Sequence, residues 1–95
     1  MYDWTDLDRA PRVLSDTELD FPAHLLKRRA RGKIVLSVNL TREGDVADVQ
    51  IDSSTLSRFN DFVLGEVEKW KFTPPTRRGR PVKARTHVPL NIRIQ

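Results

Sequence analysis

The chain has 95 residues, no cysteine, 38% hydrophobic residues and a formal net charge of +4. A chain of this length forms one domain at most and buries only about 60–65% of its unfolded surface, which leaves little room for a deep catalytic cavity. The lack of cysteine excludes disulfides and cysteine-based metal sites. No segment approaches the roughly 18 consecutive apolar residues of a membrane helix, so we expect a soluble chain whose membrane anchor, if it has one, lies outside these residues.

The charge is unevenly distributed. Residues 1–20 carry six acidic side chains and two arginines, a balance of −4, so the rest of the chain carries +8. Ten of the 17 basic residues fall in two clusters, at 27–33 and 77–85. A basic body favours an acidic partner, and nucleic acid is the first generic candidate.

Residues 1–19 are acidic, contain Pro11 and show no sustained hydrophobic period, so we expect an extended leader that lies partly on the body. A short helix should follow, with Pro22 at its first position and Gly32 just past its end. The basic residues 27–31 would then occupy its last turns, where cations complement the helix dipole.

A hairpin comes next. In residues 33–40, KIVLSVNL, the alternation predicts a strand with Ile34, Leu36, Val38 and Leu40 on one face. Residues 41–45 form the turn, with Gly44 suited to a positive φ. The return strand, residues 46–52, would place Ala47, Val49 and Ile51 on one face.

The second predicted helix, at about residues 59–70, carries the strongest periodic signal. One of its faces is apolar, formed by Phe59, Phe62, Val63, Val67 and Trp70. Its start would be capped by Ser57 or Asn60, between which the sequence does not decide. Gly65, unfavourable in a helix interior, indicates close packing there. Pro74-Pro75 should stop the helix, and Phe72 should extend its apolar cluster. The predicted structural core is therefore Phe59, Phe62, Val63, Val67, Trp70 and Phe72.

Residues 85–94 alternate as a final strand, with Val88, Leu90, Ile92 and Ile94 on one face. Pro89 cannot donate a ladder hydrogen bond, so this should be an edge strand with the missing N–H directed outward. The main-chain groups of the odd-numbered residues His87, Asn91 and Arg93 would then face the free edge and be open to a partner. The alternative is that Pro89 only protects the edge against aggregation.

The predicted order is helix, strand, strand, helix, strand. The economical fold is α+β, with two helices packed on a three-stranded antiparallel sheet and the C-terminal strand at an open edge. The first strand would be central, between the other two.

The sequence offers little for catalysis. The only histidines, His24 and His87, lie on separate predicted elements, and the four glycines form no phosphate-binding loop. We therefore expect no enzyme activity, no catalytic residues, no cofactor and no metal.

An ordered set of short motifs resembles the C-terminal, periplasmic domain of the TonB energy-transducer family. The resemblance covers roughly residues 18–95, so we divide the chain into the leader at 1–19 and a domain of this type at 20–95. Each motif is weak alone, but together their order and spacing are fairly specific: Phe21-Pro22, Gly32 before the alternating strand, Glu43-Gly44-Asp45-Val46, Ile51-Asp52-Ser53-Ser54, Phe59 entering the helix, Trp70-Lys71-Phe72-Thr73-Pro74 and Gly79-Arg80-Pro81-Val82.

The resemblance implies a periplasmic domain tethered to the inner membrane through an N-terminal anchor and working with an ExbB/ExbD-type proton channel complex. Family members bind the TonB box of outer-membrane transporters by strand addition and transmit energy for uptake of siderophores, cobalamin or similar cargo. The implied partner-binding residues are Asp20, Phe21, Pro22, Thr86, His87, Val88, Pro89, Leu90, Asn91, Ile92 and Arg93. Asp20-Phe21 replaces a familiar glutamine-tyrosine pair, so Asp20 could instead select a basic residue of the receptor.

Other readings stay open. A small nucleic-acid-binding domain would explain the basic clusters, but the aromatic candidates for base stacking, Tyr2 and Trp4, lie in the acidic leader, so we expect no nucleic-acid partner. A periplasmic adaptor of the same fold could instead dock another protein. The resemblance also allows a homodimer, and it leaves Arg77, Arg78 and Arg80 as a solvated turn or a site that steers acidic receptor segments.

Overall fold

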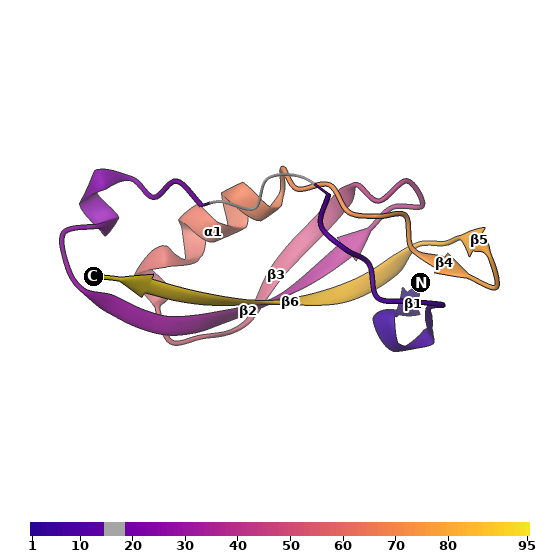
Figure 1. Ribbon diagram of the computed structural model, residues 1–95, viewed down its shortest axis with the longest axis horizontal. Helices are drawn as coiled ribbons and strands as arrows, with labels where there is room; N and C mark the ends of the chain where they lie inside the picture. The colour runs from indigo at the N-terminus through magenta and orange to yellow at the C-terminus, as the bar shows by residue number, and fades with distance from the viewer. Residues whose placement is uncertain (15–18) are drawn as a thin grey trace.

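The alternating apolar segment forms the central strand of a four-stranded sheet. Strand β2 (Ala30–Leu40) pairs antiparallel with β3 (Val46–Ser54) on one side and with β6 (Ala84–Ile94) on the other. The two-residue strand β1 (Tyr2–Asp3) lies parallel to the start of β6, which gives the order β1-β6-β2-β3 (Figure 1).

The computed structural model describes residues 1–14 and 19–95. Two acidic residues of the predicted leader, Asp16 and Glu18, lie outside the described residues. The remaining elements are the helix α1 (Asn60–Val67), the small hairpin β4 (Thr76–Arg77) and β5 (Arg80–Pro81), and 3₁₀ turns at Trp4–Asp6, Ala23–Leu25 and Ser57–Phe59. The domain is elongated, with extents of 47 × 21 × 18 Å.

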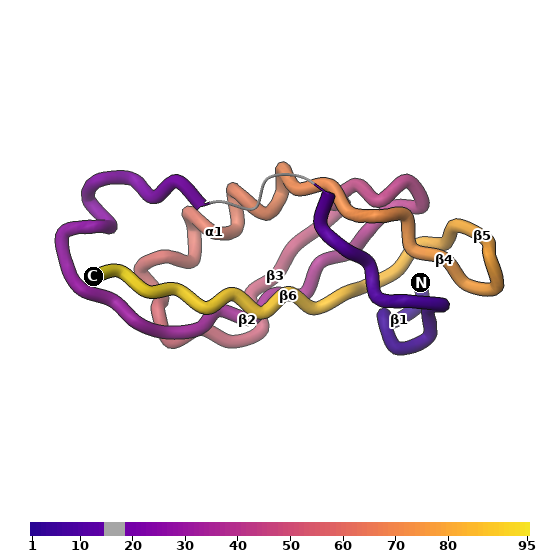
Figure 2. Tube along the Cα trace, viewed as in Figure 1, coloured from indigo at the N-terminus to yellow at the C-terminus, as the bar shows by residue number. Residues whose placement is uncertain are grey.

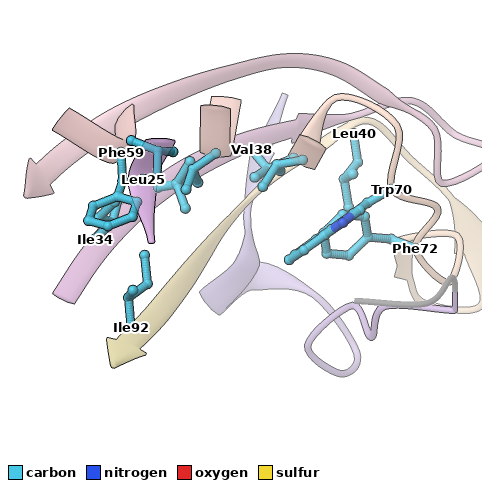
Figure 3. Packing of buried hydrophobic residues seen from close by; sticks show 11 residues of the cluster. Leu25, Ile34, Val38, Leu40, Phe59, Trp70, Phe72 and Ile92 are labelled. Atoms are coloured by element: carbon cyan, nitrogen blue, oxygen red, sulfur yellow. The ribbon is translucent and has the colours of Figure 1, made fainter. Parts of the chain in front are cut away.

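The core lies between one face of the sheet and α1. Ile34, Leu36, Val38 and Leu40 are at most 1% exposed, as the alternation of β2 predicts. Figure 3 shows the core along the sheet, with Leu25, Phe59 and Ile92 near Ile34 at one end and Trp70 and Phe72 near Leu40 at the other. Val63 and Val67 of α1 are fully buried, whereas Phe62 is half-buried.

The prediction of two helices is wrong, because the described residues contain one α-helix. The segment after Pro22 makes a single 3₁₀ turn, Ala23–Leu25, and β2 begins at Ala30, inside the predicted helix. A helix of so few residues with a brief apolar stripe is marginal, whereas β6 pairs with all eleven residues of β2. The prediction of a three-stranded antiparallel sheet is corrected too, since β1 adds a parallel pair.

Gly32 has a different role from the predicted helix end. It lies in β2, and a Cβ atom at this position would sit 2.3 Å from Thr55 Oγ1 and 2.7 Å from Leu56 Cγ. The glycine therefore permits the chain leaving β3 to cross β2 closely. Beside this crossing, Arg58 donates to the Leu25 carbonyl at 3.4 Å and holds the 3₁₀ segment in place.

A β-bulge changes the predicted facing of β3. The register shifts between Asn39 and Leu40, so Val46 instead of Ala47 pairs opposite Leu40. Ala47 is exposed, in contrast to its predicted place on the same face as Val49 and Ile51. The extra residue of a bulge cannot be read from a strict alternation.

The ends of α1 also differ from the prediction. Neither predicted cap bonds the helix start; instead Asn60 Oδ1 accepts a hydrogen bond from the Ser54 hydroxyl at 2.8 Å, which ties the helix to β3. Gly65 is exposed, and a Cβ atom there would meet nothing within 4 Å, so it does not mark close packing. The helix ends at Val67, so Trp70 lies beyond it, although it is buried at 6% exposure, and Pro74-Pro75 come too late to stop the helix.

The chain beyond α1 is held at the tip of the β2–β3 turn. The Phe72 N–H donates to the Gly44 carbonyl at 2.9 Å. Gly44 has φ +90°, and a Cβ atom there would lie 2.1 Å from the Phe72 carbonyl oxygen. Only glycine suits this position, both for its backbone conformation and for its space.

We predict opposite effects for two glycine substitutions. Gly44→Ala should lower the free energy of unfolding by about 1–3 kcal/mol, because it combines a left-handed backbone with a steric clash. Gly65→Ala, the matched control in open space, should raise it by about 1 kcal/mol through helix propensity. Urea unfolding followed by tryptophan fluorescence, in which buried Trp70 becomes exposed, measures both. A neutral Gly44→Ala would contradict the assigned close approach.

Candidate partner-binding edge

The outer edge of β6 is open over most of its length. Strand β2 covers its inner edge throughout, but on the outer side β1 pairs only with Ala84 and Arg85. Among the described residues no strand pairs with residues 86–94 from outside. This stretch, which we call the β6 edge, runs along one side of the sheet to the C-terminal residue (Figure 2).

The direction of the main-chain groups along the β6 edge follows from one hydrogen bond. The Tyr2 N–H donates to the Lys83 carbonyl at 3.1 Å, so Lys83 directs its main-chain oxygen outward. Successive residues of a strand alternate in this direction, so the odd-numbered residues of β6 face outward. Pro89 therefore lacks its N–H on the free side and costs the β2 ladder nothing. The groups offered outward are the N–H groups of His87, Asn91 and Arg93 and the carbonyls of His87, Pro89, Asn91 and Arg93.

The side chains of the β6 edge divide between the two faces of the sheet. Those of the odd-numbered residues are exposed on the face away from α1. On the helix side, Thr86 and Ile92 are 5% and 4% exposed, and Val88, Leu90 and Ile94 are half-buried. A strand added here would meet an apolar row on one face and a polar row on the other.

A polar network lies on the open face beside the edge. The Ser37 hydroxyl donates to Asp52 Oδ2 at 2.5 Å, and His87 Nε2 lies 3.6 Å from the same oxygen. The Trp4 ring lies 6.3 Å from the His87 ring. Because Ser37 donates to the carboxylate and not to the imidazole, the histidine does not activate it as a nucleophile. Within the described residues no cluster of three metal-ligating side chains occurs.

The N-terminal segment, which the sequence placed only loosely, sets where the β6 edge begins. The Asp8 carboxylate accepts hydrogen bonds from the Arg78 N–H at 2.8 Å and the Gly79 N–H at 2.9 Å. These residues form the β4–β5 turn, and both have positive φ, 53° and 78°. The N–H groups of Gly79 and Arg78 hold the pKa of the Asp8 carboxyl below its ordinary value of 3.8. Arg77 stacks over the Tyr2 ring at 4.6 Å, next to β1.

A second contact of this segment lies farther along. The Leu14 N–H donates to the Lys71 carbonyl at 2.7 Å, and the Thr73 N–H donates to the Arg12 carbonyl at 2.8 Å. The described part of the leader thus pairs with the chain that follows Trp70. The sequence carried no signal for these pairings, because they are main-chain bonds that any residue can make.

The two groups of predicted partner-binding residues lie in different layers. Phe21 packs against Phe59 and Phe62, with ring centroids 5.4 and 5.2 Å apart. Asp20 is exposed, and Pro22 precedes the 3₁₀ turn. This segment therefore lies on the helix layer, whereas residues 86–93 lie on the β6 edge.

The two basic clusters lie at opposite ends of the domain (Figure 1). Residues 27–33 lie where β6 ends, and residues 77–85 surround the β4–β5 hairpin at the other end. They do not form one continuous basic surface, which weakens the nucleic-acid interpretation. His24 is exposed in the 3₁₀ turn, apart from the network around His87.

Comparisons with known proteins point to one family. Residues 17–94 match the family model described as Gram-negative bacterial TonB protein C-terminal. The chain is 27% identical over 75 residues to a TonB protein of Xanthomonas campestris and 24% identical over 90 residues to that of Vibrio cholerae, covering 78% and 94% of this chain. It spans about a third of those relatives' length, 34% and 37%.

A solved structure is similar as well. The solution structure of the Pseudomonas aeruginosa TonB C-terminal domain matches with a TM-score of 0.67 and 22% identity, covering 90% of this chain and 87% of that one. At this identity the likeness concerns the fold. In the described parts of the chain, no helix has the length and apolarity needed to cross a membrane.

The Asp8 contact predicts a pH dependence. Since the folded pKa of Asp8 is below its unfolded value, its stabilising contribution is present above about pH 3.8 and is lost as the pH falls through the folded pKa. In an NMR titration, the Arg78 and Gly79 amide signals should move with a midpoint below 3.8, and Asp8→Asn should abolish that transition. The control Asp6→Asn should leave it unchanged. A midpoint at or above the ordinary value would contradict the contact.

Proposed function

Because the chain belongs to the family of Gram-negative bacterial TonB protein C-terminal domains, we propose that it binds the TonB box of outer-membrane transporters. The bound segment would join the sheet as an additional strand along the β6 edge. The domain would act by binding and by transmitting force, not as an enzyme. The uptake it serves would be of siderophores, cobalamin or similar cargo.

The observation that carries this proposal is the outward row of main-chain groups on β6. The hydrogen bond from Tyr2 to the Lys83 carbonyl shows that the main-chain groups of the odd-numbered residues point outward, and β1 leaves residues 86–94 uncovered. Strand addition forms its hydrogen bonds with the backbone of the partner, so it tolerates different receptor sequences. The half-buried side chains of Val88, Leu90 and Ile94 would extend the core beneath the new strand.

Membership of the family also suggests where the other parts of the transducer lie. The parts of the protein that reach the inner membrane and an ExbB/ExbD-type proton channel complex would lie outside this third of the relatives' length. The domain would work in the periplasm, tethered to the inner membrane. Mechanical force derived from the proton-motive force would then reach the receptor through the bound strand.

Asp20, Phe21 and Pro22 have a secondary role in this proposal. Phe21 packs on Phe59, and Asp20 beside it is exposed. With an aspartate in place of the familiar glutamine, this position would favour a basic residue of the receptor over a neutral one.

Removing one outward N–H tests strand addition directly. Asn91→Pro should weaken binding of a TonB-box peptide that spans residues 86–94 by about five-fold, because one hydrogen bond worth about 1 kcal/mol is lost. The β2 ladder does not use this N–H, so the variant should stay folded. Amide shifts of the labelled domain during peptide titration report both affinity and site.

Asn91→Ala is the matched control, since it removes the side chain and keeps the N–H; it should bind nearly as the original protein does. Peptide-induced shifts should concentrate along residues 86–94. Absence of shifts there, or equal affinities for the two variants, would refute strand addition at this edge.

A further inference from the structure

Two arginines face each other across the strand pair at the end of β6. Arg31 of β2 and Arg93 of β6 are direct partners in the register, and both are exposed on the face away from α1. Because Arg93 directs its main-chain groups outward, the two form a non-hydrogen-bonded pair, in which side chains approach most closely. Like charges directly opposite each other destabilise a sheet.

No carboxylate of the described residues compensates this pair. The ion pairs of the described residues are Lys69–Glu66 and Lys71–Asp45, and the Asp52 carboxylate lies beside His87; none of these contacts involves Arg31 or Arg93. Lys33, two residues along β2, adds a further positive charge on the same face. Arg29 joins Arg31 and Arg93 in lining an open pocket of about 570 Å³ at this end of the sheet.

The other end of the same face differs. There Arg85 Nε donates to Asn39 Oδ1 at 3.1 Å, and His87 lies by the Asp52 carboxylate. Cross-strand neighbours on this face are thus matched at the start of β6 and mismatched at its end. Two arginines directly opposite each other on this face therefore occur at the end of β6, whereas Arg85 at its start lies opposite a neutral asparagine.

We propose that this end of the edge selects a partner strand that carries a carboxylate opposite Arg93. The inference rests on the proposed function and adds to it a side-chain requirement. A residue opposite Arg93 on an added strand would extend its side chain on the same face, within about 5 Å at Cβ. A carboxylate there could accept bonds from Arg93 and Arg31 together and relieve their repulsion. The favoured occupant is an acidic peptide in extended conformation. The positive charges of Arg31 and Arg93 lie beside the outward N–H and carbonyl groups of β6, which an added strand can pair.

Peptide variants test this requirement. Two pairs of TonB-box peptides are compared. In one pair the polar position nearest the N-terminus is glutamate or glutamine, and in the other pair the polar position nearest the C-terminus is glutamate or glutamine. At low ionic strength, glutamate at one of these ends should bind about three- to five-fold more tightly than glutamine. The end that shows the preference reports the direction of the added strand.

The preference should disappear in the double variant Arg31→Gln/Arg93→Gln. It should persist in Arg42→Gln/Arg80→Gln, which removes the same charge elsewhere on the exposed surface. Equal affinities for glutamate and glutamine at both ends would overturn the inference, as would a preference that survives in the first variant or is lost in the second. Binding of all peptides along residues 86–94 without a preference refutes the inference alone, whereas no binding there refutes the proposed function as well.

The repulsion between Arg31 and Arg93 can also be tested in the free domain, without a bound peptide, by thermal unfolding. Arg93→Glu should raise the thermal midpoint of the free domain by about 2–4 °C at low salt, because it turns a repulsive cross-strand pair into an attractive one. The gain should shrink in about 1 M salt. An unchanged or lower midpoint at low salt would contradict the close pairing of Arg31 and Arg93.

Discussion

The backbone of Gly44, at the tip of the β2–β3 turn, lies against the backbone of Phe72, with no room for a side chain between them. This approach fixes the chain after α1 at the end of the core that holds Leu40. From there the chain must pass buried Pro75 and the β4–β5 hairpin before β6 can begin opposite Leu40. The leader pairs with the same segment from its other side, at Lys71. The path that the chain takes from α1 to β6 thus depends on the close approach that this glycine permits, and the ladder with β2 then sets the position of the open edge.

The sequence predicted the parts of the fold that follow a regular period. The alternation of β2 and the apolar face of α1 match the structure because each buries a row of side chains against one opposing layer. The predictions fail where the structure depends on pairing between strands that lie far apart in the sequence. Ala30 joins a strand because β6 is long enough to pair with it, and Ala47 turns outward because the sheet accommodates one extra residue. Neither fact is encoded in the local residues.

The candidate edge was easier to predict than its surroundings. Pro89 is incompatible with a central ladder, so the sequence alone indicates an edge strand and the side it leaves free. The limits of that edge and its charge could not be predicted. β1 is two residues long and has no pattern, and Arg31 and Arg93, far apart in the chain, become neighbours only through the register of β2 and β6. Such pairs need three-dimensional neighbours to be seen.

Pro89 also bears on which strand can occupy the edge. Two copies of this domain joined edge to edge by a two-fold axis would bring both prolines into the junction, so the shared ladder would lack two donors. A strand from a different protein meets one proline and lacks only one. A symmetric junction of two copies would therefore lose more main-chain hydrogen bonds than a junction with a strand that carries no proline, although the backbone groups of the edge are open to either.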